Sequence, residues 1–139
     1  MTLRFLLDTN VVSEPLRPRP NTRSLINLQQ HQQEVAIAAV VWHELWYGCE
    51  RLPPSVRRSA IEQYLIQVVA ATIPILSYDE PAALWHAQER ARLAALGRMP
   101  PFADGQIAAT AYVNQLILVT FNTADYADFA GLSLVDWRS

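Results

Sequence analysis

Residues 3–10 have the sequence Leu3-Arg4-Phe5-Leu6-Leu7-Asp8-Thr9-Asn10, a short apolar run that ends at an acid. A run of this length, bounded by polar turn residues, is typical of a buried β-strand. Its apolar residues follow one another instead of alternating with polar ones, as expected for a parallel strand covered on both faces. The acid then lies just past the end of the strand, where open parallel sheets bind ligands.

Short apolar runs alternate with helical segments along the rest of the chain. Further strands are expected at about 34–39, 73–76, 116–120 and 132–135, and Pro74 places the second of these at a sheet edge. Helices are expected at about 22–33, 41–52, 55–71, 79–97 and 102–115, with one turn of helix before Pro15 and a turn or short helix at 123–129. This alternation predicts an α/β fold whose parallel sheet is covered on both faces.

Length and composition limit the possible classes of protein. The 139 residues fit one domain, 1–139, and a hydrophobic content of 51% suffices for a substantial core. The net charge of −2 does not indicate a protein that binds nucleic acid through bulk positive charge. All eleven basic residues are arginine, so any phosphate recognition must come from local geometry, arginine side chains or a bound cation.

The single cysteine and the N-terminal run exclude several other arrangements. Cys49 alone can form neither an intramolecular disulfide nor a zinc-binding thiolate cluster. The first apolar run reaches Asp8 too soon for a secretory signal, and no apolar run approaches the ~20 residues of a membrane span. We therefore expect a soluble cytoplasmic protein.

Five polar residues lie where strands end or helices begin. Asp8 follows the first strand, and Asn122 and Asp125 follow the fourth. Glu44 is in the first turn of the helix after the second strand, and Asp104 opens the helix before the fourth. Crossover connections can bring all five to one edge of the sheet.

The helix at 41–52 places its acid beside the core. At about 100° per residue, its apolar side chains cover an arc of roughly 140°. Glu44 lies at the rim of that arc, and Gly48, one turn on, removes side-chain bulk next to it. Asp104 shares its helix face with Ile107 and Ala108. Neither acid is expected on a solvated outer face.

Converging carboxylates repel one another, and a divalent cation relieves that repulsion. Hard oxygen ligands suit Mg²⁺ or Mn²⁺, which could hold a phosphodiester and lower the pKa of a water that attacks it. Each acid alone has a simpler interpretation: Asp8 in a turn, Asp104 as a helix cap and Glu44 opposite the helix dipole. The convergence of several acids at one sheet edge favours the metal site.

Four segments together resemble the motifs of PIN domains, particularly those of the VapC and FitB toxin branch. They occur in family order, cover nearly the whole chain and are specific as a set, although each is weak alone. The segments are Leu6-Leu7-Asp8-Thr9-Asn10-Val11-Val12-Ser13-Glu14-Pro15, Val41-Trp42-His43-Glu44-Leu45-Trp46-Tyr47-Gly48, Asp104-Gly105-Gln106-Ile107-Ala108-Ala109-Thr110-Ala111 and Leu118-Val119-Thr120-Phe121-Asn122-Thr123-Ala124-Asp125-Tyr126.

The resemblance implies a three-layer α/β/α sandwich and Mg²⁺- or Mn²⁺-dependent endonucleolytic cleavage of RNA. The expected metal ligands and catalytic residues are Asp8, Glu44, Asp104 and Asp125, and the expected supporting residues are Asn10, Thr120 and Asn122. Two positions depart from the family pattern. Phe121 stands where a basic residue is common, and Gly105 stands where a bulkier residue is expected.

Three other enzyme classes fit the sequence less well. Receiver domains and haloacid-dehalogenase-type phosphatases need a lysine beside the phosphoryl group, and P-loop nucleotidases need Gly-Lys followed by Ser or Thr. The chain contains no lysine. The alternative that remains is a non-catalytic PIN-fold binding or regulatory module, which would have no reason to bind Mn²⁺ tightly.

The partners are expected to be RNA, an antitoxin protein and a second copy of the chain. Arg98 is the best candidate RNA contact because its loop leads towards Asp104. Residues 41–71 carry surplus apolar surface that could form a groove for a partner helix or a dimer face; alternatively, the tryptophans fill the core. The side chains concerned are Trp42, Trp46, Ile61, Tyr64, Leu65, Val68 and Val69. The resemblance implies that toxins of this branch pair with small antitoxins.

Overall fold

A five-stranded parallel sheet forms the centre of the computed structural model, which describes residues 2–139. In chain order the strands are β1 (Phe5–Leu7), β2 (Val35–Ala38), β3 (Ile75–Leu76), β4 (Ile117–Val119) and β5 (Leu134–Val135). Their spatial order is β3-β2-β1-β4-β5, and each neighbouring pair is parallel. The predicted parallel α/β fold is confirmed, with β3 at an edge as Pro74 indicated.

β1 lies in the middle of the sheet because its side chains can be buried on both faces. Leu6 pairs with Ala36 on one side and with Leu118 on the other, and all three β1 residues are buried. Burial of each leucine contributes about 1.5–3 kcal/mol of hydrophobic stabilisation. One residue further on, the Asp8 backbone N–H donates to the Val119 carbonyl at 2.9 Å. This bond fixes Asp8 beside the end of β4.

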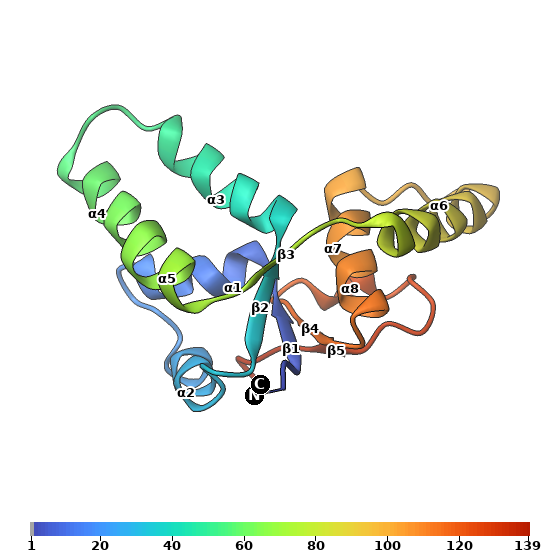
Figure 1. The fold of residues 1–139 in the computed structure, drawn as a ribbon, viewed down its shortest axis with the longest axis horizontal. Coiled ribbons are helices and arrows are strands. Elements are labelled where there is room, and N and C mark those ends of the chain that lie inside the picture. Colours follow the sequence, from blue (N-terminus) through green and yellow to red (C-terminus); the bar gives the residue numbers. More distant parts are fainter. Residues whose placement is uncertain (1) are drawn as a thin grey trace.

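Helices lie on both sides of the sheet, as Figure 1 shows. They are α1 (Thr9–Ser13), the 3₁₀ turn η1 (Glu14–Leu16), α2 (Thr22–Gln30), α3 (Ala39–Glu50), α4 (Val56–Tyr64), the π-helical turn η2 (Leu65–Val69), α5 (Ala70–Thr72), α6 (Glu80–Ala95), α7 (Phe102–Val113) and α8 (Thr123–Tyr126). Within residues 2–139, none combines the length and apolar character needed to cross a membrane.

Polar caps begin three of the long helices. Side-chain oxygens of Asn21, Ser55 and Asp79 each accept a hydrogen bond from the backbone N–H three residues later. Such caps satisfy N–H groups that have no partner inside the helix. Beyond α6, Gly97 adopts a left-handed backbone with φ of +75°, which is common for a glycine that ends a helix.

The structure differs from the predicted elements mainly between residues 55 and 72. One continuous helix was expected, whereas α4 and α5 are separated by the wider turn η2. Leu65 and Val69, at its two ends, are both buried. Apolar spacing predicts a helix in either case, because a single π-type turn inserted into an α-helix leaves the apolar pattern similar.

Candidate metal centre

Asp8 is held in place by hydrogen bonds from three other residues. It begins α1, where its Oδ1 accepts from the Thr9 backbone N–H at 2.8 Å. Its Oδ2 accepts from the Thr120 hydroxyl at 2.8 Å and from the Tyr126 hydroxyl at 3.2 Å. The residue is only 7% exposed, so these charge-assisted bonds offset the cost of burying the carboxylate.

Glu44 reaches the same edge of the sheet from α3. Its Oε1 accepts a hydrogen bond from the Thr9 hydroxyl at 2.8 Å. Thr9 thus binds Asp8 through its backbone and Glu44 through its side chain. As predicted, Glu44 is half-buried at the rim of the core face of α3.

Asp104 lies in the first turn of α7, where burial and the charges of the other three acids raise its pKa. Its pKa is raised to about 6, first by burial and then by the charges of Asp8, Asp125 and Glu44. The Tyr126 hydroxyl acts in the opposite direction by hydrogen bonding. The structure therefore brings the four acids named by the sequence into one electrostatic cluster.

The fourth acid is less constrained than the others. Asp125 lies in the first turn of α8 and is exposed, as is Asn122 just before it. Asn122 is connected to the cluster through its backbone N–H, which donates to the Thr120 hydroxyl at 3.0 Å. Asn10 is near this segment too, because its side-chain oxygen accepts from the Phe121 N–H at 3.4 Å.

The oxygen donors fit a hard divalent cation, although the acids are not yet close enough together to surround one. Across residues 2–139, no three Asp, Glu, His or Cys side chains are already grouped to hold a metal ion. Four carboxylates nevertheless converge, and their repulsion adds to burial in raising the pKa of Asp104. Oxygen donors of this kind suit Mg²⁺ or Mn²⁺.

Two residues of the cluster were not identified from the sequence. Thr9 links two of the acids, and the buried phenol of Tyr126 donates to Asp8. Burial, followed by the charges of Asp8 and Asp104, holds the pKa of Tyr126 far above its usual range, so it remains a hydrogen-bond donor. Both lie next to predicted acids in the chain, which is the only signal the sequence offers.

Arginines border the cluster on the side of Asp104. Arg98 lines a cavity of about 330 Å³ together with Asp104 and Asp125, and its guanidinium pairs with Asp128 at 3.2 Å. The position of Arg98 agrees with its candidacy as an RNA contact.

Arg138 comes close to the position where the family pattern has a basic residue. Its guanidinium lies 4.3 Å above the ring of Phe121 and donates to the Phe121 carbonyl at 2.9 Å. The C-terminal segment therefore brings a positive charge next to Phe121, although Asp136 pairs with that charge at 2.8 Å.

A groove runs from the cluster between η1, α3 and α4. Its volume is about 720 Å³, and its apolar walls include Leu16, Leu45, Ile61 and Leu65, with Glu44 at its margin. The Tyr64 hydroxyl donates to the Val12 carbonyl at 2.6 Å and fixes α4 against α1.

The two tryptophans take no part in this groove. The sequence left two alternatives for Trp42 and Trp46: a surplus apolar face, or side chains that fill the core. The structure favours the second, because both are half-buried and packed against the core. Their rings meet edge to face with centroids 5.7 Å apart, and neither lines the groove. The groove lies instead between α3, α4 and the loop after α1.

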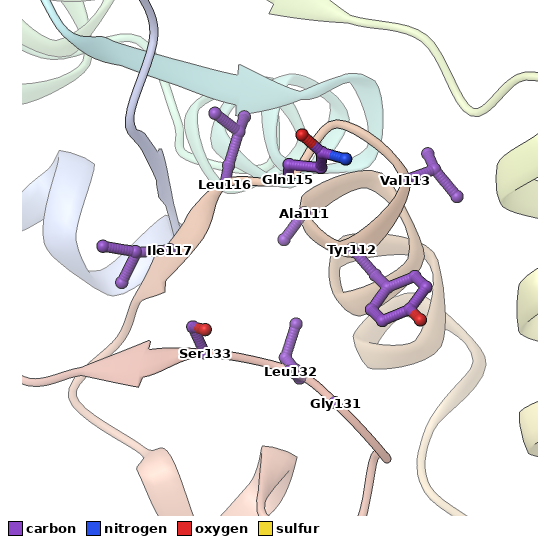
Figure 2. Close-up of a pocket in the computed structure, with 9 residues that line it drawn as sticks. All are labelled: Ala111, Tyr112, Val113, Gln115, Leu116, Ile117, Gly131, Leu132 and Ser133. Atoms are coloured by element: carbon purple, nitrogen blue, oxygen red, sulfur yellow. The ribbon is translucent and has the colours of Figure 1, made fainter.

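Another cavity, of about 530 Å³, lies at the opposite edge of the sheet, where β4 and β5 begin (Figure 2). Tyr112, Gln115 and Ser133 are its polar lining residues, and no acid or arginine lines it. Its position at the amino ends of the strands separates it from the carboxylates.

Comparison with known proteins agrees with this geometry. Residues 5–132 match the PIN domain family. The chain is 36% identical to toxin FitB of Neisseria gonorrhoeae, over 88% of this chain and 90% of that protein. It is also 36% identical to the tRNA(fMet)-specific endonuclease VapC of Shigella flexneri, over 97% of this chain and 98% of that protein.

A solved structure shares the fold over nearly its whole length. The crystal structure of FitAcB from Neisseria gonorrhoeae superposes with a TM-score of 0.87 at 34% identity, covering 96% of this chain and 97% of that one. Sequence motifs, sheet topology and these likenesses agree: the chain belongs to the PIN domain family, in the branch of the VapC and FitB toxins.

Proposed function

We propose that this chain is a metal-dependent endoribonuclease and the toxin of a toxin–antitoxin pair. The observation that carries the proposal is the convergence of Asp8, Glu44, Asp104 and Asp125. Burial, and after it the charges of the other three acids, raises the pKa of Asp104 to about 6. Relatives named as VapC ribonucleases, among them one from Haemophilus influenzae, support the reaction type. We infer that this chain acts on RNA in the cytoplasm.

The chain's own residues would prepare the site for Mg²⁺ or Mn²⁺. Asp8, Glu44, Asp104 and Asp125 would hold the cation, which when bound supplies positive charge for the phosphodiester and lowers the pKa of the attacking water. Thr120 and Tyr126 orient Asp8, and Thr9 orients Glu44. Arg98, at the margin of the same cavity, would bind a neighbouring phosphate.

The test is cleavage of RNA by the purified chain with Mn²⁺. We expect the wild-type chain to cleave single-stranded or looped RNA, and EDTA to abolish this cleavage. In Asp104→Asn the cleavage rate should fall at least about 100-fold, which corresponds to a loss of several kcal/mol of transition-state stabilisation. Glu80→Gln removes an exposed acid at the start of α6 and serves as the matched control. Equal rates for wild type and Asp104→Asn would refute the metal-site assignment. Absence of both cleavage and Mn²⁺ binding would favour the non-catalytic module.

The RNA that is cut needs a separate experiment. VapC of Shigella flexneri is named as specific for tRNA(fMet), so we propose tRNA as the first substrate class to test. Total cellular RNA should be treated with wild type and with Asp104→Asn, and the new ends mapped. Ends that occur only with wild type and fall mainly in tRNA would support this choice.

An antitoxin would occupy the apolar groove between η1, α3 and α4. Leucine and isoleucine side chains line the groove, as the apolar face of an amphipathic partner helix requires, and Glu44 lines it too, where a partner could compete with metal or RNA. Expression of the chain alone, compared with its expression beside the product of the neighbouring reading frame, tests this. We expect toxicity only in the first case, and a mass by light scattering that reveals a homodimer.

A further inference from the structure

The helix α3 has an exposed face, distinct from the one that packs on the core. His43, Tyr47 and Arg51 follow one another at intervals of four residues, which aligns them along one side of the helix. The rings of His43 and Tyr47 are nearly parallel, at 8°, with centroids 6.2 Å apart. The guanidinium of Arg51 lies 5.6 Å from the centre of the Tyr47 ring. Tyr47 is 61% exposed despite its size.

This face forms one wall of a cleft against the first turns of α7. The two helices lie next to each other at the carboxyl edge of the sheet (Figure 1). The cleft has a volume of about 490 Å³, and Phe102 from α7, 50% exposed, lies on its other wall. The guanidinium of Arg90 lies 5.2 Å from the Phe102 ring. Each wall therefore presents an exposed aromatic ring, and Arg51 accompanies the ring on the α3 wall.

The cleft is continuous with the acidic cluster. Glu44 and Gly48 line both this cleft and the apolar groove on the other side of α3. A Cβ atom added at Gly48 would meet no atom within 4 Å, so packing does not require a glycine there. Because glycine has no side chain, both cavities stay open at this position. Among residues 2–139, no aromatic side chain lines the groove, whereas Tyr47 and Phe102 line the cleft. The two cavities differ in the chemistry that they can bind.

We propose that the cleft between α3 and α7 binds an unstacked nucleobase of single-stranded RNA beside the phosphate that is cut. Tyr47 is the stacking platform, Phe102 faces it from the other wall, and Arg51 contacts the neighbouring backbone phosphate. Aromatic rings with arginines nearby are the means by which proteins hold single strands, because every base has a π-face. The proposal rests on the proposed ribonuclease function and assigns it a substrate subsite.

The test compares Tyr47→Leu and Tyr47→Trp with wild type. Leucine keeps apolar bulk but loses the ring, so we expect KM for RNA to rise about tenfold with kcat and Mn²⁺ affinity nearly unchanged. Tryptophan should keep the wild-type KM. Arg51→Gln should weaken RNA binding and reduce its dependence on salt concentration. The matched controls are Tyr112→Leu on α7 and Arg23→Gln on α2, which alter an exposed tyrosine and an exposed arginine outside the cleft.

A binding measurement without cleavage separates this proposal from the proposed function. The probe is a single-stranded RNA 12-mer with 2-aminopurine, in EDTA, because stacking on an aromatic ring quenches 2-aminopurine fluorescence. Quenching by wild type and Tyr47→Trp, but not by Tyr47→Leu, supports the subsite even if no RNA is cleaved. An unchanged KM and unchanged quenching in Tyr47→Leu overturn it while leaving the ribonuclease intact. A rise in KM accompanied by loss of dimer mass in light scattering also overturns it, because the face would then bind a second copy.

Discussion

The imidazole of His86 in α6 lies directly against the backbone of Gly105 in α7. A Cβ atom built at position 105 would fall less than 3.0 Å from three atoms of that ring. His86 is buried, its Nδ1 is 2.8 Å from the Tyr78 hydroxyl, and burial lowers the pKa of the ring. The bulkier residue of the family pattern is therefore excluded here because the neighbouring helix occupies its space, immediately after Asp104.

Gly105→Ala should destabilise the protein and weaken its metal site. The first turn of α7 must move away from His86, which costs about 1–3 kcal/mol as overpacking and displaces Asp104. We expect a lower melting temperature and weaker Mn²⁺ binding, both measured on the purified variant. The double variant Gly105→Ala/His86→Ala should recover much of the loss. Gly48→Ala is the matched control and should be stabilising, because its Cβ meets nothing and alanine favours helices.

Asp104→Asn should stabilise the metal-free protein at neutral pH although it abolishes metal binding. The folded-state pKa of Asp104 is raised from 3.8 to about 6, so the ionised carboxylate disfavours folding above that range. Relative to asparagine, wild type should lose stability as the pH rises from about 4 through 6. We expect the variant to be more stable by about 1 kcal/mol at pH 7.5 and the difference to vanish near pH 3.5.

Thermal melts across this pH range, with EDTA and with Mn²⁺, check that prediction. Mn²⁺ should raise the melting temperature of wild type much more than that of the variant, because only wild type keeps the full set of carboxylates. A variant that is less stable than wild type at every pH would show that Asp104 is not under charge repulsion in the folded protein.

Asp125 should contribute less to metal affinity than Asp8. Asp8 is buried and fixed by three neighbours, whereas Asp125 is exposed and must give up mobility to bind. Asn122 could supply an oxygen in its place. Titration with Mn²⁺ should show roughly a 100-fold loss for Asp8→Asn and less than tenfold for Asp125→Asn. Asparagine nearly preserves the side-chain volume at both positions, so the two variants can be compared directly. Equal losses of Mn²⁺ affinity would contradict this ranking.

The fold and the acids were predictable from the sequence because both follow from strand order. A continuous apolar strand such as β1 belongs in the middle of a parallel sheet, and residues that follow such strands meet at one edge. Asp8 and Asp125, which follow β1 and β4, could therefore be expected near each other. Arg98 was placed by the same reasoning, from a loop that leads to α7.

The remaining features depend on pairings between distant segments, which spacing along the chain does not specify. The bond from Tyr126 to Asp8 joins residues 118 positions apart. The contact of His86 with Gly105 depends on how closely α6 approaches α7. The place of Trp42 was left open between surface and core for a related reason: a helical wheel shows which side chains share a face, but not how far the neighbouring core extends around the helix.

Leu16→Ser should weaken binding of the antitoxin more than it weakens the fold. Leu16 is 38% exposed in the 3₁₀ turn η1 and lines the apolar groove, so its side chain makes limited contact within the chain but is available to a partner helix. Loss of a buried leucine from such an interface costs about 1–3 kcal/mol, or roughly 5- to 150-fold in Kd. Ile26→Ser on α2 is the matched control: it is 49% exposed, and it does not line the groove. Calorimetry with the product of the neighbouring reading frame should show a higher Kd for Leu16→Ser only, with RNA cleavage by the free toxin unchanged. If both variants bind the partner as wild type does, the antitoxin lies elsewhere and the groove needs another occupant.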